Sequence, residues 1–242
     1  MTVLEFRAVD VPRDTQLLRD LNPEELRLIL REARTRRFSA KSVITHQGEA
    51  ADHLLLLWRG RARCFFDTPN GKKLIQIGIT PGHILGGAAL VSRPSVYLVS
   101  TEAVRDCVVL VWDGPTIRAL ARRFPRLLEN ALSIAANYIS WYVVAITALT
   151  SQTARERLAG VLLGCVSSIG QKVPGGIELD LTNEEVANSA STTPYTASRI
   201  LSEWHKVGAI QKRRGKIFLA SPEHFFLRVV RSGTSAFPHL TS

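Results

Sequence analysis

Residues 181–219 read LTNEEVANSASTTPYTASRILSEWHKVGAIQKRRGKIFL, and no other stretch of the chain is as informative. Thr182 and Glu185 have the Thr-x-x-Glu spacing of a capping box, which predicts that a helix begins there. Thr193 and Pro194 have the order of a cap followed by the first residue of a second helix, and Gly208 predicts its end. Two short helices joined by a tight turn form a helix-turn-helix pattern.

The second of these helices is predicted to be amphipathic. Its inward face is expected to carry the apolar residues that repeat at helical spacing: Ile200, Leu201, Trp204 and Val207. Its outward face near the start carries short polar groups and one arginine, the side chains that contact base edges in a DNA major groove. The predicted base-reading residues are Tyr195, Thr196, Ser198 and Arg199.

A basic hairpin is predicted directly after the second helix. Residues 209–212 and 216–219 alternate like strands, and the Arg-Arg-Gly sequence of residues 213–215 is expected to form the turn. Cations crowd this turn with no acid among them, which favours contacts with DNA phosphates. The predicted phosphate-contacting residues come from the turn between the helices and from this hairpin: Ser191, Thr192, Thr193, Lys212, Arg213, Arg214 and Lys216.

Composition agrees with a polyanionic partner and excludes several other classes of protein. The 242 residues carry a formal net charge of +10. Three scattered cysteines, Cys64, Cys107 and Cys165, favour a reducing cytoplasm over a disulfide framework or a zinc site. No signal peptide is expected, and no apolar run is expected to reach the ~18 residues of a membrane span, so no membrane contact is predicted. No catalytic motif is found, so the chain is predicted not to be an enzyme.

The first half of the chain has a different pattern. A helix is predicted over residues 23–34, followed by short alternating strands at 42–46, 54–58, 62–66, 73–79, 96–100 and 107–112. The Asn70-Gly71 pair between two of these strands is a strong hairpin signal. Many short strands at this spacing predict an antiparallel jelly roll. The expected fold class is therefore α+β, with an N-terminal β-domain and a C-terminal winged helix-turn-helix.

A long helix after Pro125 is expected to join the two halves. Its apolar residues recur at alternating steps of four and three, which is the a/d seam of a coiled coil and predicts a parallel homodimer. The seam residues are Leu128, Leu132, Ala135, Ile139, Tyr142, Ile146 and Leu149. Four apolar residues off the seam are expected to pack on the chain's own β-domain: Leu127, Ile134, Val143 and Val144.

The long helix is expected to break near Thr150 and Ser151. A capping box at Thr153 and Glu156 predicts a further helix through about residue 169, which makes the break a natural hinge. Three regions are therefore predicted: a sensor domain over residues 1–114, a linking and dimerisation helix over 115–150, and a winged helix-turn-helix domain over 151–242.

This order of domains resembles the Crp/Fnr family of bacterial transcription regulators, and residues 193–201 carry the most specific likeness. The resemblance implies a homodimer on an inverted-repeat DNA operator, with Arg199 contacting guanine in each half-site. It also implies contact with RNA polymerase if the protein is an activator. The Ser198-Arg199 pair is closer to the Fnr branch. Tyr195 stands where the family has a glutamate, so the preferred half-site is expected to differ.

The family's phosphate cassette corresponds to residues 84–98, and here it departs from the family pattern. Gly87 stands at the position of the glutamate that takes the ribose, and the arginine position falls near Tyr97. Without these charged groups a cyclic nucleotide is not expected to bind. The candidate effector pocket comprises His83, Gly86, Gly87, Ala88, Arg93 and Tyr97.

No cofactor is predicted, although one alternative stays open. The resemblance implies that oxygen sensors of the Fnr type hold an iron–sulfur cluster with an amino-terminal group of cysteines. Here no cysteine precedes Cys64, so that cofactor is excluded. Haem is the alternative, since imidazole and thiolate are common axial ligands and this half contains His46, His53, His83 and Cys64. The alternative function is a small-molecule or haem-based sensor module that acts on a partner protein, with the helix-turn-helix as a docking surface.

Overall fold

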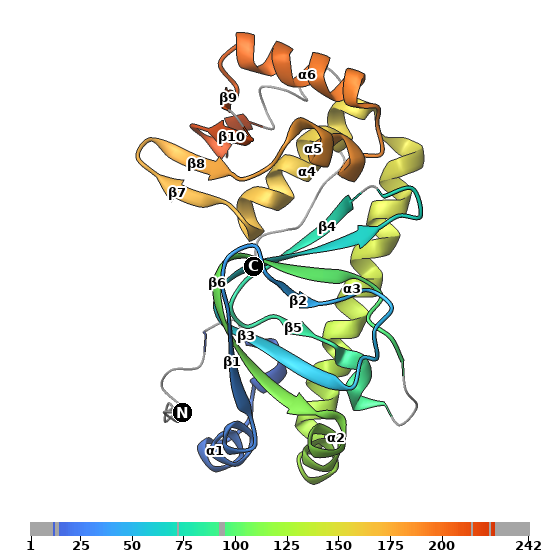
Figure 1. The fold of residues 1–242 in the computed structure, drawn as a ribbon, viewed down its shortest axis with the longest axis vertical. Helices are drawn as coiled ribbons and strands as arrows, with labels where there is room; N and C mark the ends of the chain where they lie inside the picture. The colour runs from blue at the N-terminus through green and yellow to red at the C-terminus, as the bar shows by residue number, and fades with distance from the viewer. Residues whose placement is uncertain are drawn as a thin grey trace. The chain divides into compact units, whose positions relative to one another are not determined.

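The computed structural model describes residues 12, 15–71, 73–91, 95–213, 215–222 and 224–225. The chain divides into two compact units, Met1–Thr147 and Ala148–Ser242. The fold class predicted from the sequence is confirmed: the protein is α+β, with an antiparallel β-domain, a long helix and a C-terminal helix-turn-helix domain (Figure 1).

An antiparallel six-stranded sheet forms the body of the first unit. Its strands are β1 (Arg34–Phe38), β2 (Val43–Thr45), β3 (His53–Asp67), β4 (Lys73–Ile79), β5 (Ile84–Leu85) and β6 (Ser100–Asp113). The order is β1-β6-β3-β4, with β2 paired to β6 and β5 paired to β3. The hairpin predicted at Asn70-Gly71 joins β3 to β4, and Gly71 has the positive φ of 77° that such a turn needs.

The strands predicted at 54–58 and 62–66 are one continuous strand, β3, so this prediction was wrong. Gly60 does not end the strand; the register against β6 shifts between Leu57 and Ala62, and Gly60 has a φ of 102°. A Cβ on Gly60 would lie 2.3 Å from the carbonyl oxygen of Asp106. A glycine inside a strand therefore marks a bulge here rather than a break.

Other predicted bounds need smaller corrections. The first helix, α1, spans Pro23–Arg31 instead of 23–34, because Arg34 already belongs to β1. The strand predicted at 42–46 is β2 (Val43–Thr45), and the one at 107–112 lies inside the longer β6. Residues 96–100 do not form the predicted strand. Tyr97 instead exchanges backbone hydrogen bonds with Gly48 and Glu49, and β6 begins only at Ser100.

The core of the first unit follows the alternation of side chains along β3. Leu54, Leu56 and Trp58 face the side of the sheet where the helices pack, whereas Leu55 and Leu57 face the interior of the β-domain. Trp112 on β6 is buried on the helix side, and its Nε1 donates to the carbonyl oxygen of Ile29 at 2.9 Å. This bond fastens α1 to the sheet.

Three short helical segments in this unit were not predicted. The helix α2 (Gly114–Arg123) begins where Asp113 accepts a hydrogen bond from the Thr116 amide at 2.9 Å. The 3₁₀ turn η3 (Gly87–Leu90) follows β5, and a second one, η2 (Gln16–Leu18), precedes α1. The Asp113-Gly-Pro115 sequence is a cap followed by an early proline, so a helix signal for α2 was present.

The long helix α3 (Pro125–Ser151) has two apolar faces. Leu127 and Ile134 are buried and Ala131 and Tyr138 partly buried against the first unit, at steps of four, three and four. The seven predicted seam residues are all exposed on another side of the helix. Val143 and Val144 are also exposed, so their predicted packing on the β-domain was wrong. The buried face ends at about Tyr138, before the helix reaches them.

The expectation about apolar segments also needs correction. By length and composition alone, α3 is apolar enough to cross a membrane, because residues 131–153 contain no charged side chain. A single helix of this kind is weak evidence for a membrane span. Its seven-residue apolar repeat is accounted for equally well by a second helix lying against it.

The second unit begins with α4 (Ala154–Ser168), capped as predicted by Thr153 and Glu156. The motif helices α5 (Asn183–Ser189) and α6 (Pro194–Lys206) pack beside it. A four-stranded sheet of order β7-β8-β10-β9 completes the unit. Its strands are β7 (Gln171–Val173), β8 (Gly176–Leu179), β9 (Gln211–Arg213) and β10 (Lys216–Leu219). The β7–β8 hairpin was not predicted, and β10 was predicted with its observed bounds.

Candidate nucleic-acid interface

The two motif helices start at the residues that their caps predict. In α5 the Thr182 hydroxyl accepts from the Glu185 amide at 3.1 Å, and the Glu185 carboxylate accepts from the Thr182 amide at 2.8 Å. In α6 the Thr193 hydroxyl accepts from the Thr196 amide at 3.1 Å, with Pro194 in the first turn. These bonds fix where α6 begins, and therefore which of its residues lie near its exposed N-terminal end.

The four predicted base-reading residues all lie on the surface of α6. Tyr195 is 80% exposed and Arg199 is exposed, while Thr196 and Ser198 are half-buried. The opposite face is buried, and it contains Ala197, Ile200, Leu201 and Trp204. Val207 was predicted to point inward but is 69% exposed, because the helix ends there and Gly208 turns the chain with a φ of 70°.

The turn between α5 and α6 is braced by an arginine that the sequence did not single out. Arg157 on α4 donates from Nε to the carbonyl oxygen of Ala190 at 2.8 Å and from Nη2 to that of Ser191 at 3.3 Å. Its Nη1 donates to the carbonyl oxygen of Gln152, just before α4, at 2.7 Å. Backbone carbonyls carry no side-chain signature, so sequence patterns could not identify these partners. One side chain thus joins the start of α4 to the turn.

The predicted phosphate-contacting residues of this turn differ in their availability. Ser191 and Thr193 are exposed and Thr192 is half-buried. Ser191 has a φ of 48°, in the left-handed region. The Thr193 hydroxyl accepts from the Thr196 amide and donates to the Thr196 hydroxyl at 2.9 Å. Capping therefore occupies the Thr193 hydroxyl.

The hairpin of β9 and β10 carries less uncompensated charge than its sequence indicated. Glu178 on the neighbouring strand β8 accepts from Lys216 at 2.5 Å and from Arg213 at 3.3 Å. The bond from Lys216 is the main cause that lowers the pKa of the Glu178 carboxyl below its ordinary value. Lys212 donates to the Ser202 hydroxyl on α6 at 3.3 Å. Arg214 lies outside the described residues. Glu178 lies in the unpredicted hairpin β7–β8, so its contacts with these cations could not be expected from the sequence.

A chain of charges supports Arg199 on the outer face of α6. Nη1 of Arg199 donates to Oε1 of Glu203 at 2.9 Å, one helical turn further on. The other oxygen of Glu203, Oε2, accepts from Nη2 of Arg155 on α4. The spacing of Arg199 and Glu203 is a sequence signal for such a pair, whereas the partnership with Arg155 is visible only in the fold.

In its described residues, the region predicted as an effector pocket lacks the charged groups that the resemblance implies for a phosphate cassette. Gly86 has a left-handed φ of 71° and is followed by η3. The Tyr97 ring lies 3.0 Å from where a Cβ on Gly86 would be, and the Tyr97 hydroxyl donates to the His53 carbonyl oxygen at 3.3 Å. Gly87 is exposed, and Arg93 lies outside the described residues.

Electrostatics in this region also disfavour an anion. Burial raises the pKa of the Tyr97 hydroxyl, and the carboxylates of Asp52 and Glu49 raise it further, against a smaller opposing effect of Arg36. Two acids therefore act on the place where a cyclic nucleotide would need a cation. The described residues around Tyr97 do not fit the phosphate of a cyclic nucleotide.

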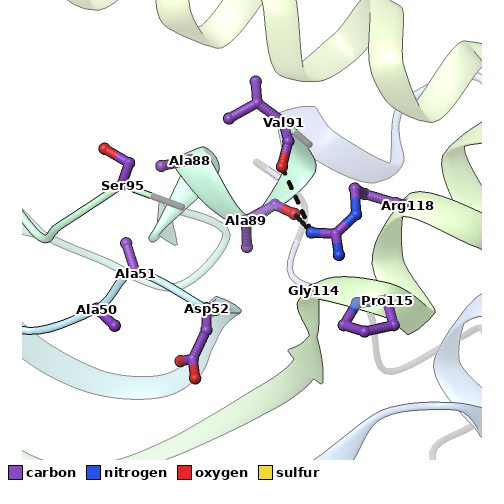
Figure 2. Close-up of a pocket in the computed structure, with 10 residues that line it drawn as sticks. All are labelled: Ala50, Ala51, Asp52, Ala88, Ala89, Val91, Ser95, Gly114, Pro115 and Arg118. Carbon is purple, nitrogen blue, oxygen red and sulfur yellow. Dashed lines mark hydrogen bonds between the residues drawn. The ribbon is translucent and has the colours of Figure 1, made fainter. Parts of the chain in front are cut away.

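A shallow hollow of about 140 Å³ lies beside the cassette rather than in it (Figure 2). Of the predicted effector-pocket residues that the structure describes, only Ala88 lines this hollow. Arg118 on α2 also lines it and donates to the carbonyl oxygens of Ala89 at 2.8 Å and Val91 at 3.4 Å. Figure 2 shows the guanidinium turned toward these backbone groups of η3. Arg118 therefore serves to hold η3 in place.

The side chains considered as haem ligands have ordinary partners. His83 Nδ1 lies 3.0 Å from the Thr80 hydroxyl, and His53 Nδ1 lies 2.5 Å from the Asp52 carboxylate. His46 is exposed. Cys64 is buried beside the Thr101 hydroxyl, and burial raises the pKa of its thiol to about 11, which disfavours the thiolate that binds iron. No three His, Cys, Asp or Glu side chains converge anywhere in the described part of the chain.

Two protein-family models match the chain. The model described as "Cyclic nucleotide-binding domain" matches residues 35–124, and the model described as "Crp-like helix-turn-helix domain" matches residues 156–225. Together they cover the β-domain with α2 and most of the second unit.

Curated proteins and solved structures are also similar to the chain over most of its length. The "Cyclic AMP receptor protein" of Thermus thermophilus is 25% identical over 205 residues, which are 85% of this chain and 92% of that protein. "Transcriptional regulator LdrP" of the same species is 23% identical over 76% of this chain and 91% of its own length. These relatives are regulators, which confirms the prediction that the chain is not an enzyme.

Among solved structures, the global regulator CLP of Xanthomonas campestris matches with a TM-score of 0.70 at 15% identity, covering 82% of this chain and 99% of that one. FixK2 of Bradyrhizobium japonicum matches with a TM-score of 0.65 at 21% identity, covering 84% and 99%. These structures support the fold alone, while the family models and curated relatives add the function. The chain therefore belongs to the Crp/Fnr family of transcription regulators.

Proposed function

We propose that this regulator binds an inverted-repeat DNA operator as a homodimer, with one copy of α6 in each half-site. The outward face of α6 is the observation that carries the proposal. Tyr195 and Arg199 are exposed while the opposite face of the same helix is buried. A helix of this kind behind a tight turn suits a major groove, and paired copies would lie about 34 Å apart along the duplex.

The proposed contacts divide into those that read bases and those that hold phosphates. Arg199 would contact guanine through two parallel N–H groups, and Tyr195, Thr196 and Ser198 would meet neighbouring base edges. Ser191, Thr192 and Lys212, together with the paired cations Arg213 and Lys216, would hold phosphates and set the register. Tyr195 in place of a carboxylate supports a half-site different from that of other branches. The Ser198-Arg199 pair supports a place nearer the Fnr branch.

The exposed seam of α3 supports the homodimer. Its seven residues form a continuous apolar stripe, and single proteins rarely expose stripes of this kind to water. A second copy of α3 in parallel would cover the stripe with the same residues. Two copies of the helix-turn-helix domain would then follow the two helices.

We also propose how the regions share the work. Residues 1–114 would sense, residues 115–150 would dimerise, and residues 151–242 would bind DNA. Any effector would act on the break after α3, which changes the spacing of the two copies of α6. No cyclic nucleotide, iron–sulfur cluster or haem is assigned to the β-domain, because the geometry around Tyr97 and Cys64 supports none of them. The protein would act in the cytoplasm, with RNA polymerase as a partner if it activates transcription.

Selection from a pool of random duplexes tests the proposal. The purified full chain should enrich duplexes that contain two guanine-bearing half-sites in inverted orientation, about one helical turn apart. Sedimentation of the complex should give two protein chains per duplex. Enriched sites without two-fold symmetry would contradict the dimeric arrangement. Failure to retain any duplex at low salt would contradict DNA binding itself.

A further inference from the structure

Glu203 is a charged residue on α6 that the proposed contacts do not use. It lies one helical turn beyond Arg199, and both of its carboxylate oxygens are engaged. Oε1 accepts from Arg199 at 2.9 Å, and Oε2 accepts from Arg155. A carboxylate in a helix that faces DNA ordinarily repels phosphates, so its presence here needs a reason.

Glu203 is paired with Arg155, a half-buried residue on the neighbouring helix α4. Arg155 lies in the first turn of α4, whose start is fixed by the capping box of Thr153 and Glu156. Its guanidinium is 5.9 Å from the centre of the Trp204 ring, and Trp204 is buried. Arg155 is therefore placed by both a helix cap and an aromatic ring. Its bond to Glu203 therefore fixes the position of the Glu203 carboxylate.

We propose that Glu203 is a positioning residue for base recognition: clamped by Arg155, it holds the Arg199 guanidinium in the orientation that contacts guanine. This inference rests on the proposed function. Arg155, Glu203 and Arg199 together carry one net positive charge, so Glu203 is compensated before DNA arrives. Arginine has five N–H groups in a planar fork. After one of them bonds to Glu203, two others can still donate to a base.

Pre-orientation is the physical gain. A free arginine on a helix surface explores many rotamers, and immobilising such a side chain on binding costs about two- to tenfold in affinity. An exposed Arg–Glu pair alone would hold Arg199 only weakly. The second bond, from Arg155, fixes the carboxylate and makes the support stiffer. The benefit should appear as discrimination at the guanine and not as general affinity for DNA.

The test measures discrimination with the full chain. One duplex carries the selected operator, and a second has adenine in place of the guanine at which the Arg199→Ala variant loses discrimination. The ratio of the two Kd values is compared among the parent, Glu203→Gln and Arg155→Met. Glu184→Gln is the matched control, because Glu184 is an exposed acid on α5 and its loss changes the net charge equally. Each variant is also measured in the Arg199→Ala background.

The expected result is a ratio that falls about two- to tenfold in Glu203→Gln and in Arg155→Met, but stays at the parent value in Glu184→Gln. In the Arg199→Ala background the same changes should leave the ratio unaltered, because Glu203 acts through Arg199. A merely structural role would lower affinity for both duplexes without moving the ratio. Arg155→Met keeps the inference testable if Glu203→Gln does not fold.

Three results would overturn the inference. If the parent discriminates and Glu203→Gln discriminates equally, Glu203 does not position Arg199; if Glu203→Gln discriminates better, Glu203 competes with DNA for Arg199. In both cases the proposed function stands. If the parent binds the two duplexes with the same affinity and Arg199→Ala changes nothing, the base-reading role of α6 is wrong, and the role of Glu203 falls with it.

Discussion

The recognition helix α6 and the cassette around η3 differ in what they retain of the same family architecture. Around α6 the fold is present together with the side chains that we propose read bases, and the exposed Arg199 donates to Glu203. Around η3 the backbone includes the left-handed Gly86, but the resemblance to the family places Gly87 and Tyr97 where charged residues are expected. The backbone shape of a cassette depends on glycine dihedrals and packing. It can therefore persist when the charged side chains that bind a ligand are replaced.

This contrast limits what a family match establishes. Residues 35–124 match a model described as a cyclic nucleotide-binding domain, yet the place for the phosphate holds a tyrosine ring influenced by two acids. The match thus reports the fold of the β-domain, and the residues decide its ligand. In the second unit the fold and the side chains point to the same function.

The largest expected effect comes from a change that separates the two proposed copies of α6 and leaves the β-domain intact. Leu132→Glu places a charge in the exposed seam of α3. Residue 132 occurs in both copies, so the proposed dimer would lose two leucines that its interface buries. Dimerisation should therefore weaken by more than about 100-fold. Sedimentation equilibrium would measure this, and affinity for the operator should fall with it.

Ser133→Glu is the matched control for this change. Ser133 is exposed on a side of α3 that belongs to neither apolar face, so a charge there should leave the dimer unchanged. Thermal unfolding of both variants should resemble that of the parent for the β-domain. A dimer that survives Leu132→Glu would show that another surface joins the two chains.

The next effect in size concerns base reading alone. Arg199→Ala should remove about 1–3 kcal/mol of discrimination per half-site, because a bidentate contact with guanine is lost. Binding to random duplex should persist through the phosphate contacts. Footprints of the parent and the variant on the selected operator would measure the change. Arg199→Lys keeps the charge without the planar fork, so it should lose most of the same discrimination. Equal discrimination in all three proteins would remove Arg199 from the proposed reading face.

Sequence patterns predicted α6 well because its signals are local. Thr193, Pro194 and Gly208 mark its ends within a few residues, and the apolar spacing identified its buried face. Val207 failed because the spacing continued past the last turn, where the helix no longer has an inside. The base-reading candidates follow from the same pattern. Once the apolar residues define the buried face of α6, the remaining residues near its start must lie on the exposed face.

Partners distant in the chain could not be predicted in this way. Glu178 meets Arg213 and Lys216 only because β8 pairs with β10, and the β7–β8 hairpin is too short to show an alternating pattern. Gly60 was misread because a glycine in a strand signals a break or a bulge with equal force in sequence. Only the register against β6 distinguishes the two.

A smaller effect would sharpen the account of the hairpin of β9 and β10. Glu178→Gln removes the acid that engages Arg213 and Lys216, which frees both cations for phosphates. Affinity for all duplexes should rise by roughly two- to fivefold at low salt, with a steeper dependence on salt concentration. Discrimination among sequences should not change. A salt titration with the operator and with random duplex would measure both. An unchanged salt slope would mean that these cations do not reach DNA.

The pH dependence of this effect follows from the lowered pKa of Glu178. A carboxyl with a lowered pKa is fully ionised at any pH well above the ordinary pKa of the group. Its ion pairs are lost only as the pH falls through the lowered pKa. Between about pH 5.5 and 8 the ratio of affinities of Glu178→Gln and parent should therefore stay constant. A ratio that approaches one already near pH 5.5 would contradict the lowered pKa.

The smallest expected effect tests the other side of the comparison. Cyclic AMP or cyclic GMP at millimolar concentration should leave both the Tm and the operator affinity unchanged. A ligand at a hundred times its Kd would stabilise the folded state by about 2.7 kcal/mol, which a thermal shift detects readily. The Thermus thermophilus protein named "Cyclic AMP receptor protein" provides the positive control. The physical reason for a null result is local: the Tyr97 ring fills the space beside Gly86, and Asp52 and Glu49 add negative charge where the phosphate would lie. A shift of several degrees would mean that a cation outside the described residues reaches the cassette, and the contrast between the two regions would disappear.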